Sequence, residues 1–237
     1  MLISSFEERN ARHKNNLDRL LKFLRDEVWS NSIVLADVLG LTKTGVYNVL
    51  GHAERGGLIL SHHVPQLQHK IYGITQLGLL YSWGEQEQME HHSYFEPSKV
   101  KPITKNHYLL TQMARLRAER AGWQSWQPGH LLKTDLTKRP DATVKNISGA
   151  IIAVELERTV KSKKRYEAIF ADYLQAIKRN EYESIHYVCP DKDFADRLAR
   201  FFKTFQTIPI AGQRVALTEK HIARFPVYSL SDWPPLL

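Results

Sequence analysis

Cysteine is nearly absent from this chain, which holds a single one, Cys189, among 237 residues. One thiol excludes a disulfide framework within the chain and a metal site built from several cysteines. Long apolar runs are also absent, because no stretch approaches the roughly 18 apolar residues of a membrane span. The first residues, MLISSFEERNARHK, lack the continuous apolar core of a signal peptide. We therefore expect a soluble, cytoplasmic protein that does not act at a membrane.

The composition has a surplus of positive charge. The chain carries 33 Lys and Arg residues against 25 Asp and Glu residues, and its sequence pI is about 9.5. Such a surplus is typical of a surface that binds phosphates, although a basic surface that serves only solubility has the same composition. The apolar fraction of 43% is enough for one large core or two small ones.

The first part of the chain has the pattern of three short helices. Apolar residues recur at helical spacing over residues 17–28. A second helix is expected over Ile33–Leu39, where Gly40 is a typical C-terminal stop. A third helix is expected to begin at Thr42 and to end at Gly56. Three helices joined by tight turns favour a helix-turn-helix.

A β-hairpin is expected after the third helix. Leu58–Leu60 and Lys70–Ile74 are short strand-like runs around a polar tip that contains Pro65. The next segment, Thr75–Leu80, resembles the T-x-x-G helix start that follows the wing in many bacterial winged-helix regulators. Together these patterns predict a winged-helix DNA-binding domain over residues 1–88.

The third helix is expected to enter the major groove of DNA as the recognition helix. Its apolar residues Val46, Val49 and Leu50 should pack inward. The residues expected to contact DNA from this domain are polar, basic or aromatic, namely Lys43, Thr44, Tyr47, Asn48, Arg55 and Lys70.

Residues 89–105 are polar and without sustained periodicity, which predicts a linker. Helical and strand-like patterns then alternate over residues 106–237. The expected helices are 106–121, 162–180 and 191–205, and the expected strands are 149–157, 184–189 and 214–217. This alternation predicts an α+β or α/β domain, with a mixed β-sheet flanked by helices.

Three carboxylates in this second domain form the candidate chemistry. Glu155 and Glu157 end an apolar strand and, being two residues apart, point to one face, while Asp141 lies 14 positions before Glu155. Carboxylates on a buried strand need a cation or a basic partner. Oxygen ligands of this kind suit Mg²⁺ or Mn²⁺, so we expect a metal site that activates water for attack on a phosphate. The alternative is an edge strand whose acids form salt bridges with Arg158 and Lys161.

The same residues resemble the PD-(D/E)xK nuclease superfamily. Pro140-Asp141 matches the PD pair, and Glu155-Leu156-Glu157 stands in place of (D/E)-x-K, so that Glu157 occupies the lysine position. The resemblance implies a restriction-endonuclease-like fold, and it requires a basic residue from elsewhere. The expected suppliers of positive charge are Lys161 and Lys163, while Lys164 and Arg165 are expected to contact DNA and Glu119 to add a fourth metal ligand.

A winged helix followed by such a core, with N-H-x-L at Asn106–Leu109 and V-E-L-E-R-T at Val154–Thr159, resembles the replication-relaxation family, and within it the MobC-type plasmid relaxases. The resemblance implies strand-specific nicking of double-stranded DNA at a plasmid origin of transfer. It also implies an accessory mobilisation protein and a coupling protein as partners.

Other functions remain open from the sequence. A winged-helix regulator or replication-origin protein with a degenerate nuclease domain would bind DNA without cutting it. A defence endonuclease would use the same core on another target. Tyr166 lies near the acids in the sequence and keeps a covalent route open, although we expect it to pack in the core and the reaction to proceed by hydrolysis.

Overall fold

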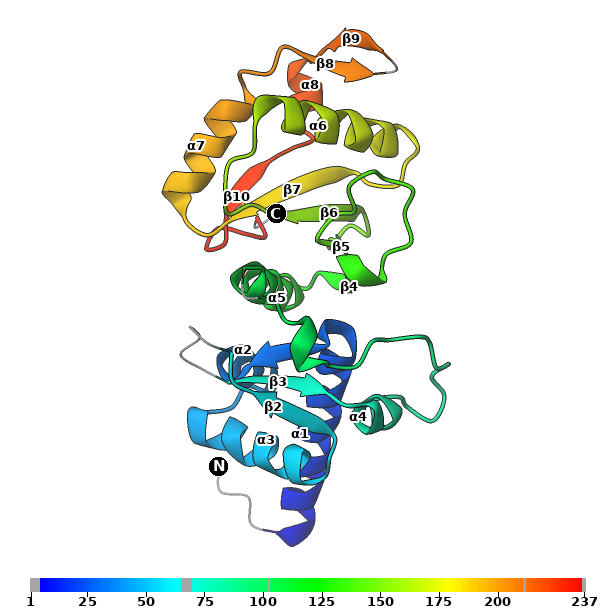
Figure 1. Ribbon diagram of the computed structural model, residues 1–237, viewed down its shortest axis with the longest axis vertical. Coiled ribbons are helices and arrows are strands. Elements are labelled where there is room, and N and C mark those ends of the chain that lie inside the picture. The colour runs from blue at the N-terminus through cyan, green and yellow to red at the C-terminus, as the bar shows by residue number, and fades with distance from the viewer. Residues whose placement is uncertain (1–4, 65–69, 102, 211, 236–237) are drawn as a thin grey trace. The chain divides into compact units, whose positions relative to one another are not determined.

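The computed structural model describes residues 5–64, 70–101, 103–210 and 212–235. The chain divides into two compact units, Met1–Gln112 (unit 1) and Met113–Leu237 (unit 2). The division falls inside helix α5 (Lys105–Arg120), so the residues expected as a linker, 89–105, belong to unit 1. Both units combine helices with sheets, which confirms a mixed α and β fold (Figure 1).

Unit 1 begins with three helices. They are α1 (Phe6–Glu27), α2 (Ser32–Leu39) and α3 (Lys43–Arg55). Side chains cap each start: Thr42 Oγ1, for example, accepts a hydrogen bond from the amide of Gly45 at 3.2 Å. Gly40 ends α2 with a φ of 65°, a conformation that glycine adopts without a steric penalty. The expected second and third helices are confirmed, and the first extends further toward the N-terminus than the apolar pattern predicts.

The described residues of unit 1 contain a three-stranded antiparallel sheet with the order β1 (Trp29–Asn31), β3 (Ile71–Ile74) and β2 (Ile59–His62). The two strands of the expected hairpin are confirmed, whereas β1 was not predicted because three residues are too few to establish a strand pattern. The tip expected at Pro65 lies outside the described residues.

The T-x-x-G segment begins helix α4 (Gln76–Tyr81). Thr75 Oγ1 donates to the carbonyl oxygen of Gly57 at 2.7 Å and accepts from the amide of Gly78 at 3.0 Å. A Cβ on Gly78 would overlap the carbonyl oxygen of Leu58. Threonine and glycine are therefore both needed, one to cap the helix and the other to let it approach the chain before β2 closely.

The segment after α4, which includes a 3₁₀ turn at Pro97–Lys99, is anchored to the sheet of unit 1. The amide of Phe95 donates to the carbonyl of Ile74 at 2.8 Å, and the ring of Phe95 is buried against Gly73, where a Cβ would overlap it. Arg25 lies 4.1 Å from the ring centre of Trp83. These contacts explain why residues expected as a linker belong to unit 1.

Unit 2 is built on a five-stranded mixed sheet among its described residues. The strands, in spatial order, are β10 (Val227–Ser229), β7 (Ser184–Cys189), β6 (Ile151–Leu156), β5 (Ala142–Lys145) and β4 (Gln124–Pro128). The pairs β4–β5 and β5–β6 are antiparallel, and β6–β7 and β7–β10 are parallel. Strand β6 therefore lies inside the sheet and is not an edge strand.

The helices of unit 2 are α6 (Lys163–Lys178), α7 (Lys192–Phe202) and the short α8 (Glu219–Ile222), and a 3₁₀ turn follows β4 at Gly129–Leu131. The strand expected at 214–217 is β9 (Gln213–Ala216), but it pairs with β8 (Thr207–Ile210) in a separate two-stranded sheet. The expected strand is therefore present but lies outside the main sheet, whose last strand in chain order is β10.

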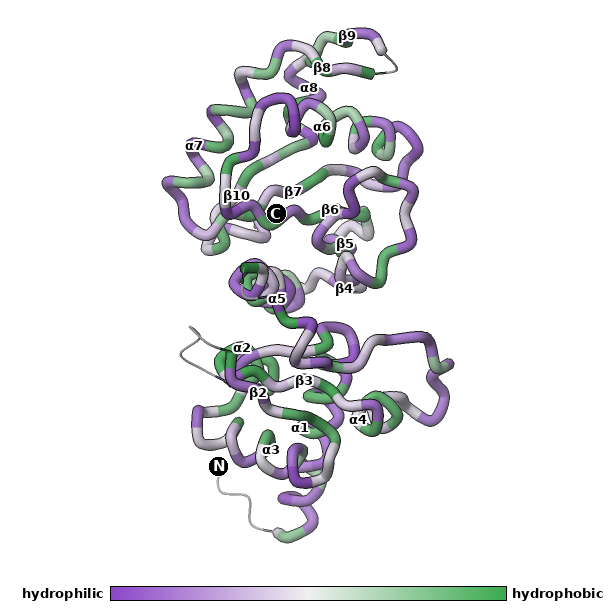
Figure 2. Tube along the Cα trace, in the orientation of Figure 1, coloured by the Kyte–Doolittle hydropathy of each residue, from purple (hydrophilic) through white to green (hydrophobic). Residues whose placement is uncertain are grey.

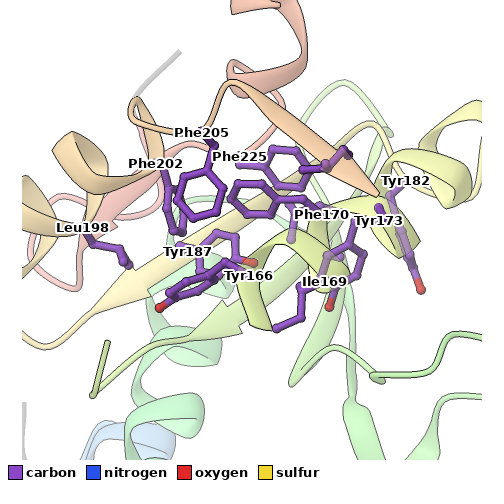
Figure 3. Close-up of a cluster of buried hydrophobic side chains, with 14 of the residues drawn as sticks. Tyr166, Ile169, Phe170, Tyr173, Tyr182, Tyr187, Leu198, Phe202, Phe205 and Phe225 are labelled. Carbon is purple, nitrogen blue, oxygen red and sulfur yellow. The ribbon is translucent and has the colours of Figure 1, made fainter. Parts of the chain in front are cut away.

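An aromatic core fills the space between α6, α7 and one face of the main sheet (Figure 3). Tyr166 and Phe170 of α6 contact Phe202 of α7, with ring centres 5.1 and 4.9 Å apart. Strand β7 contributes Tyr187 and Cys189 to the same core. Burial, followed in effect by the charge of Glu157, raises the pKa of the Cys189 thiol to about 12.

Within the described residues, no single helix is long and apolar enough to cross a membrane. The helices α2 and α3 reach that length and composition only as a pair, with a bend of 101° between them.

Candidate active site

Of the two glutamates that the sequence singles out, Glu155 lies in strand β6 and Glu157 directly follows its last residue, Leu156. Glu155 is opposite Tyr187 in the register with β7, and the amide of Glu157 continues this pairing by donating to the carbonyl of Val188 at 2.9 Å. Both side chains point toward α6, as the two-residue spacing predicts, because both contact tyrosines of that helix. They are only 1% and 2% exposed, so each charge needs a partner inside the protein.

Glu155 has two such partners. Lys138, in the loop before β5, forms an ion pair with Oε2, and the hydroxyl of Tyr173 donates to Oε1. Burial raises the pKa of Glu155, and the nearby carboxylate of Asp141 raises it further, while Lys138 and Tyr173 oppose these effects. The Glu155 carboxyl therefore lies in a site with a second acid and one cation.

Asp141 is held at the start of β5 beside the end of β6. Its amide donates to the carbonyl of Val154 at 3.0 Å, and its Oδ2 accepts from the amide of Leu156 at 2.7 Å. The Pro140-Asp141 pair is fixed from the other side by Gly129, whose amide donates to the carbonyl of Asp141 at 2.7 Å. The structure thus brings Asp141 and Glu155 together from adjacent strands.

Glu157 has different partners. Its Oε2 forms an ion pair with Lys161 and accepts a hydrogen bond from the hydroxyl of Tyr166 at 3.0 Å. Tyr166 is fully buried, and burial together with the charge of Glu157 raises the pKa of its hydroxyl. The ion pair with Lys161 matches one half of the salt-bridge alternative, although the strand itself is interior.

The carboxylates expected to bind a metal lie only partly together. In the part of the chain that the structure describes, no three His, Cys, Asp or Glu side chains are arranged to hold a metal ion. Of the four carboxylates expected as ligands, Asp141 and Glu155 are neighbours. Their mutual repulsion and their oxygen donors fit Mg²⁺ or Mn²⁺, so these are the two residues that would hold the ion.

The remaining predicted residues of unit 2 lie elsewhere. Glu119 is exposed on α5, where its carboxylate pairs with Arg115 at 2.7 Å. Lys163 places its Nζ 5.4 Å from the ring centre of Phe205, and Lys164 and Arg165 are exposed on the first turn of α6. In the described part of the chain, none of these four side chains forms a hydrogen bond or an ion pair with Asp141 or Glu155.

Sequence reasoning missed Lys138 and Tyr173. Lys138 precedes Asp141 by three residues, and Tyr173 follows Tyr166 by seven, a spacing that places both tyrosines on one face of a helix. This spacing is the sequence feature that could have indicated Tyr173, because two tyrosines on one face of α6 can each reach one of the two glutamates at the end of β6. Tyr187 adds a third buried hydroxyl, which has no hydrogen-bond partner among the described residues.

All but one of the candidate DNA-contacting residues of unit 1 lie on one side of α3. Val46, Val49 and Leu50 are buried, as predicted, and they pack the helix into the core of unit 1. The residues proposed to contact DNA are exposed, namely Lys43, Thr44, Tyr47, Asn48 and Arg55 on α3 and Lys70 before β3.

A hollow of about 550 Å³ lies at the other end of β6, beside Ile151, Asn180 and Arg224. Asp141, Glu155 and Glu157 do not line it.

Comparison of the chain with protein-family models, with curated proteins and with solved structures gives no match. The function of the chain is therefore inferred from its own geometry.

Proposed function

We propose that this protein is a metal-dependent DNA endonuclease whose unit 2 cleaves a phosphodiester bond. The observation that carries the proposal is the meeting of Asp141, Glu155 and Lys138 at one end of the central strands β5 and β6. Two acids and one cation at a strand end are the groups that such a cleavage requires.

Each residue has a distinct part in this proposal. Asp141 and Glu155 would hold Mg²⁺ or Mn²⁺, which when bound polarises the phosphate and makes a bound water a better nucleophile. Lys138, 29% exposed at its side chain, would stabilise negative charge that develops on the phosphate. Tyr173 holds the Glu155 carboxylate in place. Glu157 occupies the position where the PD-(D/E)xK pattern has a lysine. In this proposal Lys138, from the loop before β5, supplies that positive charge instead.

Hydrolysis is favoured over a covalent tyrosine route. Tyr166 is fully buried, and its hydroxyl is engaged with Glu157. A nucleophile must reach the phosphorus atom in line, and a hydroxyl in this position is enclosed by the aromatic core.

DNA binding by unit 1 is part of the same proposal. The helices α1 to α3 and the antiparallel β2–β3 hairpin have the order expected of a winged helix, and α3 exposes its polar side. We propose that α3 enters the major groove. By resemblance to the replication-relaxation family, the proposed target is a plasmid origin of transfer, and the proposed partners are an accessory mobilisation protein and a coupling protein.

A second candidate function is DNA binding without cleavage. One observation favours it: Lys138 and Lys161 already form ion pairs with Glu155 and Glu157 within the protein. Buried acids paired in this way can serve the fold alone.

Nicking of supercoiled plasmids distinguishes the two functions. Plasmids with and without a transfer origin are incubated with the protein in Mg²⁺ or Mn²⁺, beside an EDTA control. We expect metal-dependent nicking that Asp141→Asn and Glu155→Gln abolish and that Glu119→Gln, at the exposed acid of α5, preserves. Binding to the plasmid without nicking in either metal would favour the second function. Nicking of both plasmids alike would reject the transfer origin as the target.

A further inference from the structure

The surplus of positive charge is not shared equally by the two units. Unit 1 carries 12 Lys and Arg residues against 11 Asp and Glu residues, whereas unit 2 carries 21 against 14. A recognition helix in unit 1 therefore does not account for the basic character of the chain. The cations that would attract a polyanion belong chiefly to the unit with the candidate active site.

Many of the cations of unit 2 are already engaged. Lys138, Lys161 and Arg214 form ion pairs with Glu155, Glu157 and Glu167. Other arginines of this unit donate to carbonyl oxygens or to exposed acids, namely Arg115, Arg117, Arg139, Arg179 and Arg224. The cations without such partners are the ones available to a ligand.

Five of the available cations gather at one place. Arg158 follows Glu157, Lys164 and Arg165 lie on the first turn of α6, and Arg200 and Lys203 lie at the end of α7. All five are exposed and have no ion pair or side-chain hydrogen bond with any described residue. We call these five residues the α6–α7 basic surface.

Packing brings the two helix ends together. Lys163 lies over the ring of Phe205, just beyond α7, and the ring of Phe201 is 6.0 Å from that of Tyr166 on α6. Figure 2 shows hydrophilic and hydrophobic residues alternating along α7. Its buried residues are Ala195, Leu198 and Phe202, and its exposed ones are Lys192, Asp193, Asp196, Arg197 and Arg200. The first turn of α6 contains no acidic residue, and its N-terminus adds a partial positive charge.

We propose that the α6–α7 basic surface binds the phosphate backbone of DNA and supplies most of the affinity that does not depend on sequence. This inference rests on the proposed function, because the surface begins one residue after Glu157, which follows β6 at the strand end where Asp141 contacts Leu156. A backbone bound along it would be held beside the acids of β6. Phosphate contacts of this kind position DNA without selecting its sequence.

Salt dependence of binding tests this proposal. The variant Lys164→Gln, Arg165→Gln, Arg200→Gln and Lys203→Gln removes four charges from the surface. The control Lys145→Gln, Lys178→Gln, Lys192→Gln and Lys220→Gln removes four exposed charges from other parts of unit 2. Because both sets of residues are exposed, the two variants should have the same thermal unfolding temperature. All measurements use the full-length chain.

Binding is measured by fluorescence anisotropy on a labelled duplex without a transfer origin. Each phosphate contact adds about 0.9 to the slope of log affinity against log salt concentration. We expect the surface variant to lose about 2 to 4 units of slope and the control to lose less than about 1 unit. Equal losses in the two variants, with wild-type binding intact, would overturn the inference alone. No binding by the wild type would overturn the proposed DNA-binding function as well.

Discussion

The hydroxyl of Tyr173 donates a hydrogen bond to the buried carboxylate of Glu155, on the strand across from its own helix. Tyr173→Phe removes this donor and leaves the ring in place. We expect the variant to lose about 1 to 3 kcal/mol of unfolding free energy, because a buried charge loses a hydrogen bond. Urea denaturation measures the loss. Tyr228→Phe, at a half-buried hydroxyl without a hydrogen-bond partner among the described residues, is the control and should change little. Equal effects of the two would show that the bond to Glu155 contributes nothing.

Lys138 lies beside the acids of the candidate site, whereas Lys163 does not, so substitutions of these two lysines can be compared directly. We expect Lys138→Gln to lower single-turnover nicking at saturating protein by about 100-fold, as for loss of a group that stabilises transition-state charge. Lys163→Gln should stay within about threefold of wild type, because Lys163 contacts Phe205 and neither Asp141 nor Glu155. Lys138→Arg, which keeps the charge, should restore part of the rate. Wild-type nicking by Lys138→Gln would remove this lysine from the proposed reaction.

Gly78 is expected to tolerate no side chain. Gly78→Ala places a methyl group against the carbonyl oxygen of Leu58 and must move either α4 or the start of β2. We expect a loss of about 2 kcal/mol or more in the stability of unit 1, measured by hydrogen exchange of the amides of α3 and β3. Gly84→Ala meets no atom closer than 3.7 Å and should cost less than about 0.5 kcal/mol. A tolerated Gly78→Ala would show that α4 can shift freely.

His186 should make unit 2 sensitive to acid. Burial lowers the pKa of this histidine from 6.5 to about 4, and its Nδ1 accepts a hydrogen bond from Trp233 at 3.1 Å. Because the unfolded chain takes up a proton near pH 6.5 and the folded chain does not, stability falls as the pH drops from about 6.5 to about 4. This shift corresponds to about 3 kcal/mol. In His186→Gln the loss measured by denaturation at a series of pH values should be smaller by this amount. An unchanged pH dependence would show that His186 does not titrate in this range.

Local features of the sequence predict the helices of unit 1 well. The caps Asn31 and Thr42 and the stop at Gly40 lie within the residues whose backbone they control, so the bounds of α2 and α3 follow from short segments. The start of α1 does not follow, because its first turns are held by the capping box of Ser5 and Glu8 and carry few apolar residues.

The main sheet is only partly predictable. Strands β6 and β7 are apolar runs that the sequence identifies, whereas β10 has three residues and is defined by its pairing with β7. That pairing joins residues about 40 positions apart, so no local pattern in the sequence identifies β10 as a strand of the main sheet.

The candidate site shows the same limit. Alternation along β6 predicts that Glu155 and Glu157 share a face, and contacts with Tyr173 and Tyr166 agree. The ion pair between Lys138 and Glu155 is beyond local reasoning, because it depends on the course of the loop before β5. Spacing identifies acids on a strand, but only the folded chain shows which cation each acid meets.

The one thiol of the chain offers a chemical reporter of the folded state. Cys189 is buried at the end of β7, and its raised pKa keeps it protonated at neutral pH. An alkylating reagent can therefore modify it only when the strand opens. The rate of that modification reports how often the sheet opens beside Glu157, and it is measured on the chain without any substitution.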